Sequence, residues 1–482
     1  MMKESNEDLT MSEYQDKIIK KITKEIRVSK EKLFGWGRYA YTDCVIAYPQ
    51  NVDELKELLK ICLHNGYSIT PKGGGCSFGD LITNKKGIVV DLACFNEVID
   101  FNKEKGILTT QGGTSAGRVL NHVLPYNWMM RGLPGTSFGT MAGFIANNVH
   151  GKDSFKNGHF GRGVIFMKML LASGEIINLS REENPDIFNA VIGGMGLLGI
   201  IIEATFQLIK IPGSMVEVER KYFRSIPELF NLFLTVTDDI DMDAAWIDGF
   251  DKNGRGIFQT AKWLNKNPDV VPESMEKIQK KLMGKIPINL AYPLIKPFVC
   301  RTSMSALNKL AYWGSKTSKN KNILHLYQYY YPHMTSIPDS PKAMEGGLVG
   351  FQIIVPDDKA CEFIMKLLDV CRKYKLESWF LGVKRHKLDP YLLSFAEDGY
   401  STTIEIPGRF TKLSRFSAFL DKMISLAVDY NGKINLAKDA LLKPHHIRVM
   451  YPKLPEFLEI KQKLDPNKLF GSDHSRRLLL NS

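Results

Sequence analysis

The 482-residue sequence has few of the features that mark a membrane-spanning, secreted or metal-binding protein. It contains no run of about 18 apolar residues, and its polar N-terminal stretch lacks an apolar segment followed by a small-residue cleavage site. Its seven cysteines never adopt the CxxC spacing of a metal or redox site. We therefore expect no transmembrane helix, no secretory signal, no metal and reduced thiols, as in a cytoplasmic protein.

Carboxylates are scarce relative to cations, since 52 Asp and Glu against 64 Lys and Arg give a net charge of +12. Such a charge favours nucleic acid, an acidic membrane surface or an anionic substrate as partner. No RRM, zinc-finger or helix-turn-helix signature accompanies it, so we expect no nucleic acid. The lysine-rich residues 277–285, expected to form an amphipathic helix, and the apolar residues 286–300 leave a peripheral membrane contact open.

The chain is longer than the roughly 250–300 residues that one hydrophobic core supports, which predicts two domains of an α+β fold. Apolar spacing and turn residues predict helices over 52–65 (ending at Gly66), 115–123, 185–192 and 415–430, strands over 67–71, 87–92, 107–112, 199–209, 216–223, 347–355, 402–406 and 433–437, and a hairpin over 164–179 turning at Ser173-Gly174. Tyr329 to Tyr331 alternate as in a strand or offer a stacking surface. We expect an N-terminal arm over 1–30, a first domain over 31–211, a second over 212–412 and a C-terminal segment over 413–482.

The strongest local pattern is a glycine loop after a predicted strand, KGGGCSFGD over residues 72–80. Consecutive glycines permit positive φ and leave backbone N–H groups unobstructed, which is what a pyrophosphate needs. The GxxxxGK[ST] order of a P-loop is absent, and a plain tight turn would use the same residues. The loop alone therefore leaves both interpretations open.

Two further segments rich in small residues favour a flat ligand. Residues 133–159 read LPGTSFGTMAGFIANNVHGKDSFKNGH, and residues 192–199 read IGGMGLLG. Small side chains let a planar ligand lie directly against the backbone. Three such segments in one domain are hard to explain by turns alone.

These segments, in this order, resemble the vanillyl-alcohol-oxidase-like (PCMH-type) FAD-linked oxidases, and within them the decaprenylphosphoryl-ribose oxidases. The resemblance also rests on GWGR at 35–38, AAWID at 244–248, FQIIVP at 351–356, INLAKD at 434–439 and DPNKLFGSD at 465–473. It implies an FAD-binding domain of two subdomains, a substrate-binding cap built on an antiparallel sheet flanked by helices, and a C-terminal segment that returns to the flavin.

The resemblance also implies the residues that hold FAD. They are Lys72, Gly73, Gly74, Gly75, Cys76, Ser77, Phe78, Gly79, Asp80, Gly135, Thr140, Met141, Ala142, Gly143, Asn147, Asn148, Val149, His150, Ile201 and Asn435. Many relatives attach the flavin through a histidine at the position of Cys76. We therefore expect a non-covalent flavin.

The same resemblance places Lys438 beside the N1/C2=O edge of the flavin as the catalytic residue. When a hydride leaves the substrate for flavin N5, negative charge grows at that edge, and a fixed ammonium stabilises it. A lysine with a lowered pKa there would alternatively accept the hydroxyl proton. The family pattern assigns Lys152, Gln352, Lys384 and Ser401 to the substrate pocket, where lysines suit an anionic ligand. Gly350, Thr403 and Phe78 depart from the pattern, which has glutamine, cysteine and tyrosine there.

The expected function is FAD-dependent oxidation of a secondary hydroxyl on a sugar-like, lipid-phosphate-linked substrate, as the first half of an epimerisation. A NAD(P)H-dependent short-chain reductase would be the partner that reduces the ketone. Two alternatives stay open: an alditol or aldonolactone oxidase that uses O2, and a non-catalytic basic binding protein on the same fold.

Overall fold

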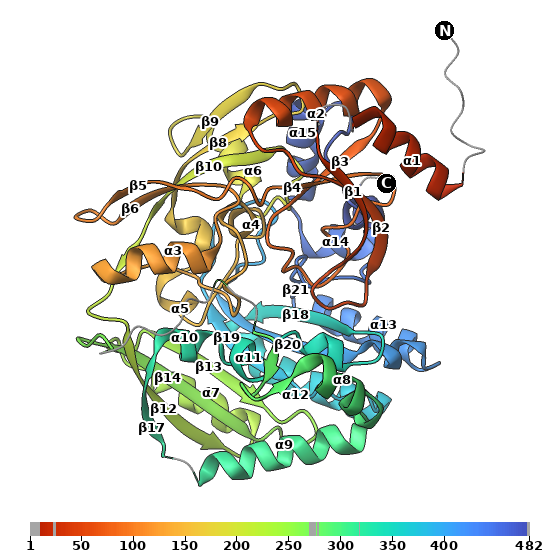
Figure 1. Ribbon diagram of the computed structural model, residues 1–482. Coiled ribbons are helices and arrows are strands. Elements are labelled where there is room, and N and C mark those ends of the chain that lie inside the picture. The colour runs from red at the N-terminus through yellow and green to blue at the C-terminus, as the bar shows by residue number, and fades with distance from the viewer. Residues whose placement is uncertain (1–9, 23–25, 269–275, 277–278, 318, 480–482) are drawn as a thin grey trace.

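The computed structural model describes residues 10–22, 26–268, 276, 279–317 and 319–479. The described chain forms two bodies, one above the other in Figure 1. The upper body holds the elements up to about residue 211, and the lower body is built on one large sheet. One hydrophobic cluster continues through both bodies, from Met141 and Ile145 above to Phe351 and Ile404 below.

The upper body contains two sheets and is the FAD-binding domain of two subdomains that the sequence predicts. The first sheet has the order β1 (Val28–Phe34), β2 (Tyr41–Ala47), β4 (Gly87–Asp91) and β3 (Ser68–Lys72), with α1 (Met11–Ile22) and α2 (Val52–Asn65) packed beside it. The second has the order β5 (Val98–Asn102), β6 (Ile107–Gln111), β10 (Ile200–Gln207), β8 (Val164–Leu170) and β9 (Ile176–Ser180). The helices α3 (Ala116–Val123), α4 (Met141–Ala146), α5 (Ser154–Asn157) and α6 (Pro185–Val191) and the short pair β7 (Trp128–Met129) and β11 (Ile209–Lys210) complete it.

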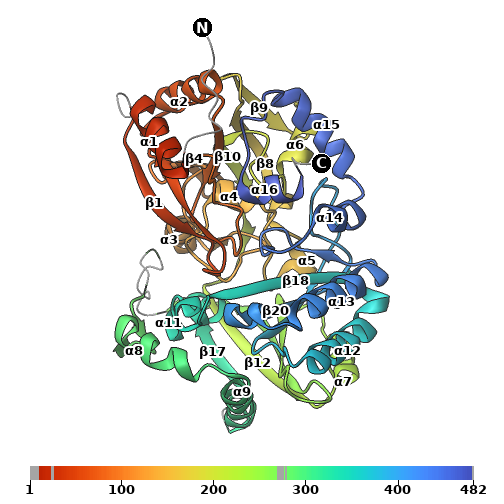
Figure 2. The same ribbon diagram turned by 90° about the vertical axis from the view of Figure 1, so that its right-hand side faces the viewer.

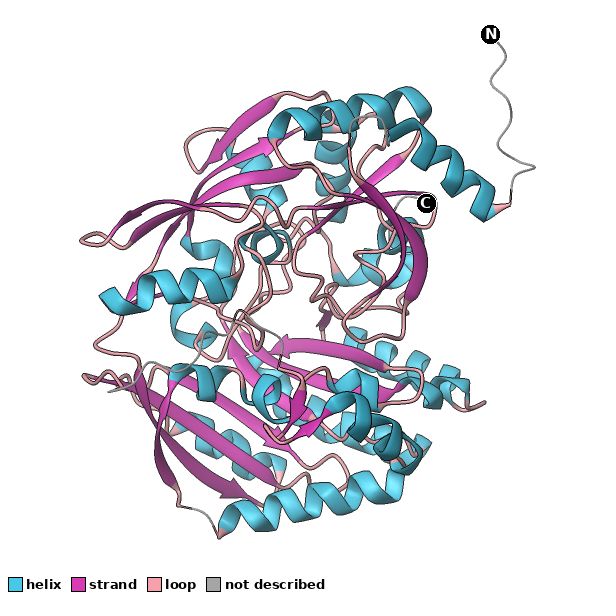
Figure 3. Cartoon of the chain, in the orientation of Figure 1, coloured by secondary structure: helices cyan, strands magenta, loops and turns pink. Residues whose placement is uncertain are grey.

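The lower body is the cap, an antiparallel sheet of eight strands flanked by helices (Figures 2 and 3). The strand order is β17 (Lys321–His325), β12 (Met215–Phe223), β14 (Gly256–Leu264), β13 (Met242–Ile247), β19 (Leu381–His386), β20 (Gly399–Pro407), β18 (Leu348–Pro356) and β21 (Lys433–Ile434). The helices α7 (Ile226–Leu234), α12 (Asp357–Tyr374) and α13 (Phe416–Asp429) pack against one another and the sheet. The α+β class and the two-domain fold are confirmed.

The predicted ends of helices and turns are confirmed where the sequence contains a capping side chain or a glycine. The α2 helix begins after Asn51, whose side chain accepts a hydrogen bond from the Glu54 amide, and ends at Gly66 with φ of 69°. The β8–β9 hairpin turns at Gly174 with φ of 86°. In both cases a short side-chain or glycine signal fixes the end of the element.

Three local predictions are wrong. Tyr329 and Tyr330 lie on a helix, α10 (Leu326–Tyr330), and Tyr331 is its C-cap residue. All three rings are buried, so the alternation of buried and exposed side chains that marks a strand is absent. The described part of residues 277–285 is no helix: β15 (Lys281–Leu282) and β16 (Ile286–Pro287) form a hairpin through Gly284, where φ is 71°; Lys277 lies outside the described residues. The strand predicted over 433–437 ends at Ile434, because the Asn435 side chain accepts a hydrogen bond from the Ala437 amide and turns the chain.

The chain crosses between the two bodies after β21. The α13 helix and β21 belong to the cap, so the cap extends beyond residue 412. The later helices α14 (Pro444–Met450), α15 (Leu454–Leu464) and α16 (Asp473–Leu478) lie beside the FAD-binding domain (Figure 2), where Phe470 forms a bridge with Ile69. At the other end of the chain, α1 buries Ile18 and Ile22 in the first subdomain.

Candidate active site

The glycine loop presents free backbone donors. None of the amides of residues 73–77 donates a hydrogen bond to another described residue, and the loop itself is half-buried, with Gly74 exposed. A Cβ on Gly74 would lie 1.9 Å from the Phe138 carbonyl oxygen, and one on Gly79 would lie 1.9 Å from that of Asp439. Glycine is therefore required where the loop meets the second and the C-terminal segments, and the open amides form an anion receptor.

Ion pairs fix both ends of this loop. The Lys72 Nζ lies 2.7 Å from Asp91 Oδ2. Asp80 receives two hydrogen bonds from the Arg477 guanidinium of α16, of 2.7 and 3.0 Å. Lys72 and Asp80 thus hold the loop in shape, while Gly73 to Ser77 offer the donors.

The second segment adds buried polar atoms without a protein partner. The Asn147 Oδ1 and the His150 Nδ1 are buried and accept no hydrogen bond among the described residues. Asn148 differs, because its amide group bonds Asp389, Ser394 and the Gly161 N–H and so is saturated within the protein. Unpaired buried acceptors and donors are what a polar cofactor edge would satisfy.

The other residues that the sequence predicts for the cofactor lie around the same region. Thr140 caps α4 by accepting from the Gly143 amide, which places Met141, Ala142 and Gly143 in the first turn of that helix. A narrow crevice includes Ile201; its lining combines small residues (Ala146, Gly194, Gly196, Gly199) with larger apolar ones (Met169, Val191, Leu197, Leu198). A Cβ on Gly135 would make only an ordinary contact, 3.8 Å from the Tyr330 carbonyl oxygen, and Val149 follows Asn148 in the segment that contacts the cap. These features fit FAD.

Cys76 is a thiol held in the glycine loop. Its Sγ lies 3.7 Å from Thr136 Oγ1 and 3.5 Å from the Gly74 carbonyl oxygen. Burial raises its pKa, so the unreactive protonated form predominates near neutrality. This environment favours a dissociable flavin over a cysteinyl link.

Gln352 is the centre of a polar network between the cap and the FAD-binding domain. Its Oε1 lies 3.0 Å from His150 Nε2 and accepts a hydrogen bond of 3.1 Å from Asn435 Nδ2. Its Nε2 donates to Ser401 Oγ at 2.9 Å. Residues from both domains and from the C-terminal segment, all predicted from the sequence, therefore meet at one side chain.

Three half-buried lysines surround this network. Burial, with Lys384 nearby, lowers the pKa of Lys152 to about 7, and burial, with Lys438 nearby, lowers that of Lys384 to about 8. Burial also lowers the pKa of Lys438, which Glu405 opposes. The Lys152 Nζ donates to the Tyr329 carbonyl, but neither Lys384 nor Lys438 has a hydrogen-bond partner or ion pair at 4 Å or less among the described residues. Half-buried ammonium groups that lack a partner in the protein favour an anionic ligand.

The sequence did not single out three polar residues that the fold brings here. Glu405 lies on β20 on the same face as Ser401 and Thr403, and burial raises its pKa to about 7 despite Lys438. His386 Nε2 lies 2.7 Å from Ser401 Oγ, and His386 Nδ1 lies 2.8 Å from His159 Nε2. The two-residue spacing of Lys384 and His386 on a predicted strand was the available signal, since it places both on one face.

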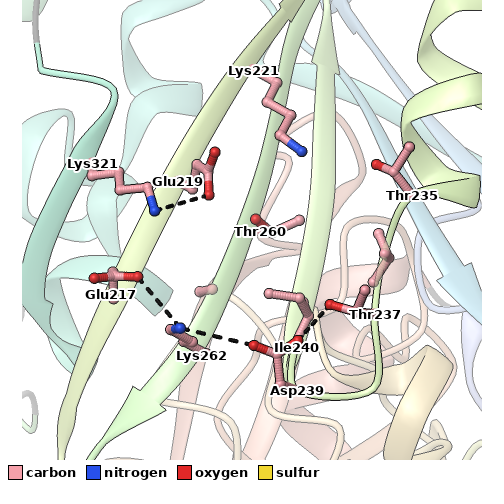
Figure 4. Close-up of a pocket in the computed structure, with 12 residues that line it drawn as sticks. Glu217, Glu219, Lys221, Thr235, Thr237, Asp239, Ile240, Thr260, Lys262 and Lys321 are labelled. Atoms are coloured by element: carbon pink, nitrogen blue, oxygen red, sulfur yellow. Dashed lines mark hydrogen bonds and ion pairs between the residues drawn. The ribbon is translucent and has the colours of Figure 1, made fainter.

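A separate depression of the described surface lies elsewhere, on the strands β12 and β14 (Figure 4). Its charged groups pair with one another: Lys321 with Glu219 at 3.5 Å, and Lys262 with Glu217 at 3.7 Å. Lys221 is the one charged lining residue here without an ion pair among the described residues, and exposed, mostly self-paired charges of this kind contribute little to ligand binding. We therefore assign the candidate site to the Gln352 network.

Phe78 and Gly350, two departures from the family pattern, fit each other. The Phe78 ring stacks on Trp36 at 4.7 Å and lies beneath the Lys438 Nζ at 5.2 Å. A Cβ on Gly350 would lie 2.6 Å from the Phe78 ring. A phenylalanine in this position therefore requires glycine on β18.

The substitution Gly350→Gln, which installs the residue of the family pattern, should lower the free energy of unfolding by about 1–3 kcal/mol because the Phe78 ring must move. Adding Phe78→Ala should recover part of that loss, since it removes the clash. Denaturant unfolding of the two single variants and the double variant measures this coupling. Additive losses would contradict the proposed fit.

Comparisons with known proteins agree with this geometry. The sequence profile described as an FAD binding domain matches residues 44–180, and that of D-arabinono-1,4-lactone oxidase matches residues 352–478. Decaprenylphosphoryl-beta-D-ribose oxidase of Mycolicibacterium smegmatis is 26% identical over 467 residues, covering 95% of this chain and 99% of the relative. A putative D-arabinono-1,4-lactone oxidase of Neurospora crassa is 30% identical over 161 residues, 33% of this chain and 29% of that protein.

The two matched profiles cover different parts of the structure. The first covers the glycine loop and the segment through His150, and the second covers Gln352, Lys384, Ser401 and Lys438. L-galactono-1,4-lactone dehydrogenase of Arabidopsis thaliana, 27% identical over 161 residues, is similar over 33% of this chain and 26% of its own length. The chain is thus similar to PCMH-type FAD-linked oxidases at both ends of its fold, and it is an FAD-dependent oxidoreductase that acts on CH–OH groups.

Proposed function

We propose that the chain oxidises a secondary hydroxyl of a sugar carried on a phosphate-linked lipid, giving the ketone that begins an epimerisation. The observation that carries this proposal is the set of three half-buried lysines around Gln352, two of them without a partner among the described residues. The name of the long M. smegmatis relative supports the substrate class.

Bound FAD supplies the acceptor for the substrate hydride. The amides of residues 73–77 would hold its pyrophosphate, and Asn147 and His150 would meet its polar edge. Gln352 and Ser401 orient the substrate hydroxyl by hydrogen bonds. Lys438, held by the turn after β21, would stabilise the negative charge that grows on the flavin as the substrate gives up its hydride. Glu405 nearby favours the ammonium form of Lys438.

Lys152 and Lys384 would bind the phosphate of the substrate. Both ammonium groups are charged below their pKa values of about 7 and about 8 and neutral above them. Affinity for an anion should therefore be highest below pH 7 and fall as the pH rises through 8. Titration of the flavin absorbance with ribose 5-phosphate at a series of pH values measures this, and Lys152→Met should flatten the lower part of the profile. A pH-independent affinity would count against the phosphate site.

Anaerobic flavin bleaching tests the function itself. A phosphoprenyl ribose or arabinose should reduce the flavin of the purified holoenzyme, while the free pentose should do so poorly. Absence of a flavin spectrum, or equal reduction by the free sugar, would contradict the proposal.

The match to the D-arabinono-1,4-lactone oxidase profile favours one second candidate, an aldonolactone or alditol oxidase using O2. Rapid hydrogen peroxide formation with a lactone or xylitol would support it. Trichloroacetic acid precipitation separates the two further, because flavin remaining with the pellet indicates the covalent attachment common among those relatives. The protonated thiol of the half-buried Cys76 predicts release.

The proposal includes a NAD(P)H-dependent short-chain reductase that reduces the ketone. It also includes a cytoplasmic location with peripheral contact at the membrane that holds the lipid carrier. No described helix combines the length and the apolarity needed to cross a bilayer.

A further inference from the structure

The segment between the cap strands β14 and β17 exposes an unusual amount of apolar surface. Of the 18 large hydrophobic side chains exposed among the described residues, nine lie between residues 283 and 313. They occupy the β15–β16 hairpin, α8 (Ile288–Ile295), the turn η4 (Lys296–Phe298) and α9 (Arg301–Lys316). Phe298 is 74% exposed and Leu310 is 69% exposed, so these side chains find no cover within the described chain.

The exposure on α9 is organised as a face. Met304, Asn308 and Tyr312, spaced four apart, are its buried residues. Leu307, Leu310 and Trp313, spaced three apart, are exposed together on a different side of the helix. Figures 1 and 2 show α9 along the end of the cap remote from the FAD-binding domain, with α8 just before it in the chain. A second apolar stripe turned outward signals a partner surface.

The charge around this face has one sign. Residues 277–338 contain ten lysines and arginines and no aspartate or glutamate. Lys281, Lys285, Lys296 and Lys309 make no ion pair with another described residue, whereas Arg301 pairs with Glu377 of the cap. This segment, which also exposes the apolar side chains, therefore contributes strongly to the excess of cations over carboxylates in the whole chain.

We propose that the surface of the β15–β16 hairpin, α8, η4 and α9 docks on a membrane rich in anionic phospholipid. The apolar side chains would enter the boundary between headgroups and acyl chains, and the lysines would extend to the phosphates. A second copy of this face is a poor occupant, because a two-fold contact would set cations against cations. Trp313, with the Lys316 Nζ 4.8 Å from its ring, has the amphipathic character that suits the interface.

This surface gives the membrane contact of the proposed function a location, and its test uses no substrate, so the two proposals fail separately. The holoenzyme is sedimented with vesicles of phosphatidylcholine alone and with vesicles containing about 30% phosphatidylglycerol. Binding is expected only to the anionic vesicles and should weaken with added salt. Equal binding to both vesicles, or to neither, would overturn the proposal.

Two sets of variants localise the contact. Leu307→Gln with Leu310→Gln should weaken vesicle binding by at least about tenfold, because two apolar side chains no longer enter the bilayer. Leu234→Gln with Leu388→Gln, at exposed positions outside this surface, is the matched control and should bind as the unmodified chain does. The flavin spectrum of each variant confirms folding. Undiminished binding by the first pair, or a change of oligomeric state or capture of an acidic protein in place of lipid binding, would overturn the assignment.

Discussion

Replacement of Lys438 by alanine should slow anaerobic reduction of the flavin by about 10²–10³-fold while FAD stays bound. The expected size is that of removing one preorganised group that stabilises charge developing in a transition state. The side chain makes no hydrogen bond to another described residue, so its loss should disturb the fold little, and its nearest recorded contact is the Phe78 ring. Stopped-flow absorbance with the reducing substrate measures the rate.

Lys438→Met separates charge from volume, because methionine fills similar space without an ammonium. It should be as slow as alanine if charge is the important property. Lys422→Ala, on the exposed side of α13, is the control for loss of a lysine and should reduce at the normal rate. An unchanged rate in Lys438→Ala would remove the catalytic assignment and favour a binding protein on this fold.

The pH dependence of the same step distinguishes the two roles of Lys438. Its pKa lies below the usual value because of burial, with Glu405 acting in the opposite direction. A stabilising ammonium is lost as the pH rises through that pKa, so the rate should fall with increasing pH. A lysine acting as base would give the reverse trend, and the observed slope decides between them.

The glycine loop and the residues of the C-terminal turn could be predicted because their signals are local. Consecutive glycines, and Lys438 after an apolar strand, are visible in a few residues of sequence. The strand ended early for an equally local reason, the Asn435 side chain, whose turn-forming contact competes with the sheet. Local side-chain chemistry therefore explains both why the position of Lys438 could be predicted and why the strand before it was predicted too long.

The remainder depends on contacts between distant segments. Glu405 comes near enough to Lys438 to influence its pKa, and His386 contacts His159, only because β19, β20 and β18 lie side by side and face the segment around His150. Tyr329 to Tyr331 also depend on distant contacts. Their composition is typical of a strand, but burial within the cap outweighs it and a helix forms. A single sequence does not show which residues of neighbouring strands lie opposite each other. It therefore predicts which residues belong to the site, but not which of them are in contact.

Arg477 is the residue whose replacement should cost the most stability. Its guanidinium lies between Asp80 at the end of the glycine loop and Asp439, whose side chain is completely buried. Its Nη1 also donates to the Leu442 carbonyl at 2.6 Å. One side chain of α16 therefore joins the cofactor loop to the turn that carries Lys438.

Arg477→Met should lower the free energy of unfolding by about 3–5 kcal/mol, because it leaves the carboxylate of Asp439 buried without its guanidinium partner. Arg448→Met, at an exposed position of α14, should change it by no more than about 0.5 kcal/mol. Denaturant unfolding of the two holoenzymes gives the comparison. FAD should also dissociate more readily from Arg477→Met, since the loop that ends at Asp80 loses its anchor; an unaltered FAD affinity would show that the ion pair serves stability alone.

Acid unfolding provides an independent check of the same ion pair. Burial alone would raise the pKa of Asp439, but the neighbouring His474 and Arg477 hold it below its usual value. A carboxyl whose pKa is lower in the folded state stabilises the protein above the unfolded pKa of about 4, and that stabilisation disappears as the pH falls. Arg477→Met removes much of this difference in pKa, so its acid unfolding midpoint should lie at higher pH than that of the unmodified chain. An unchanged midpoint would mean that His474 and the backbone amides of Leu441 and Leu442, rather than Arg477, keep Asp439 ionised.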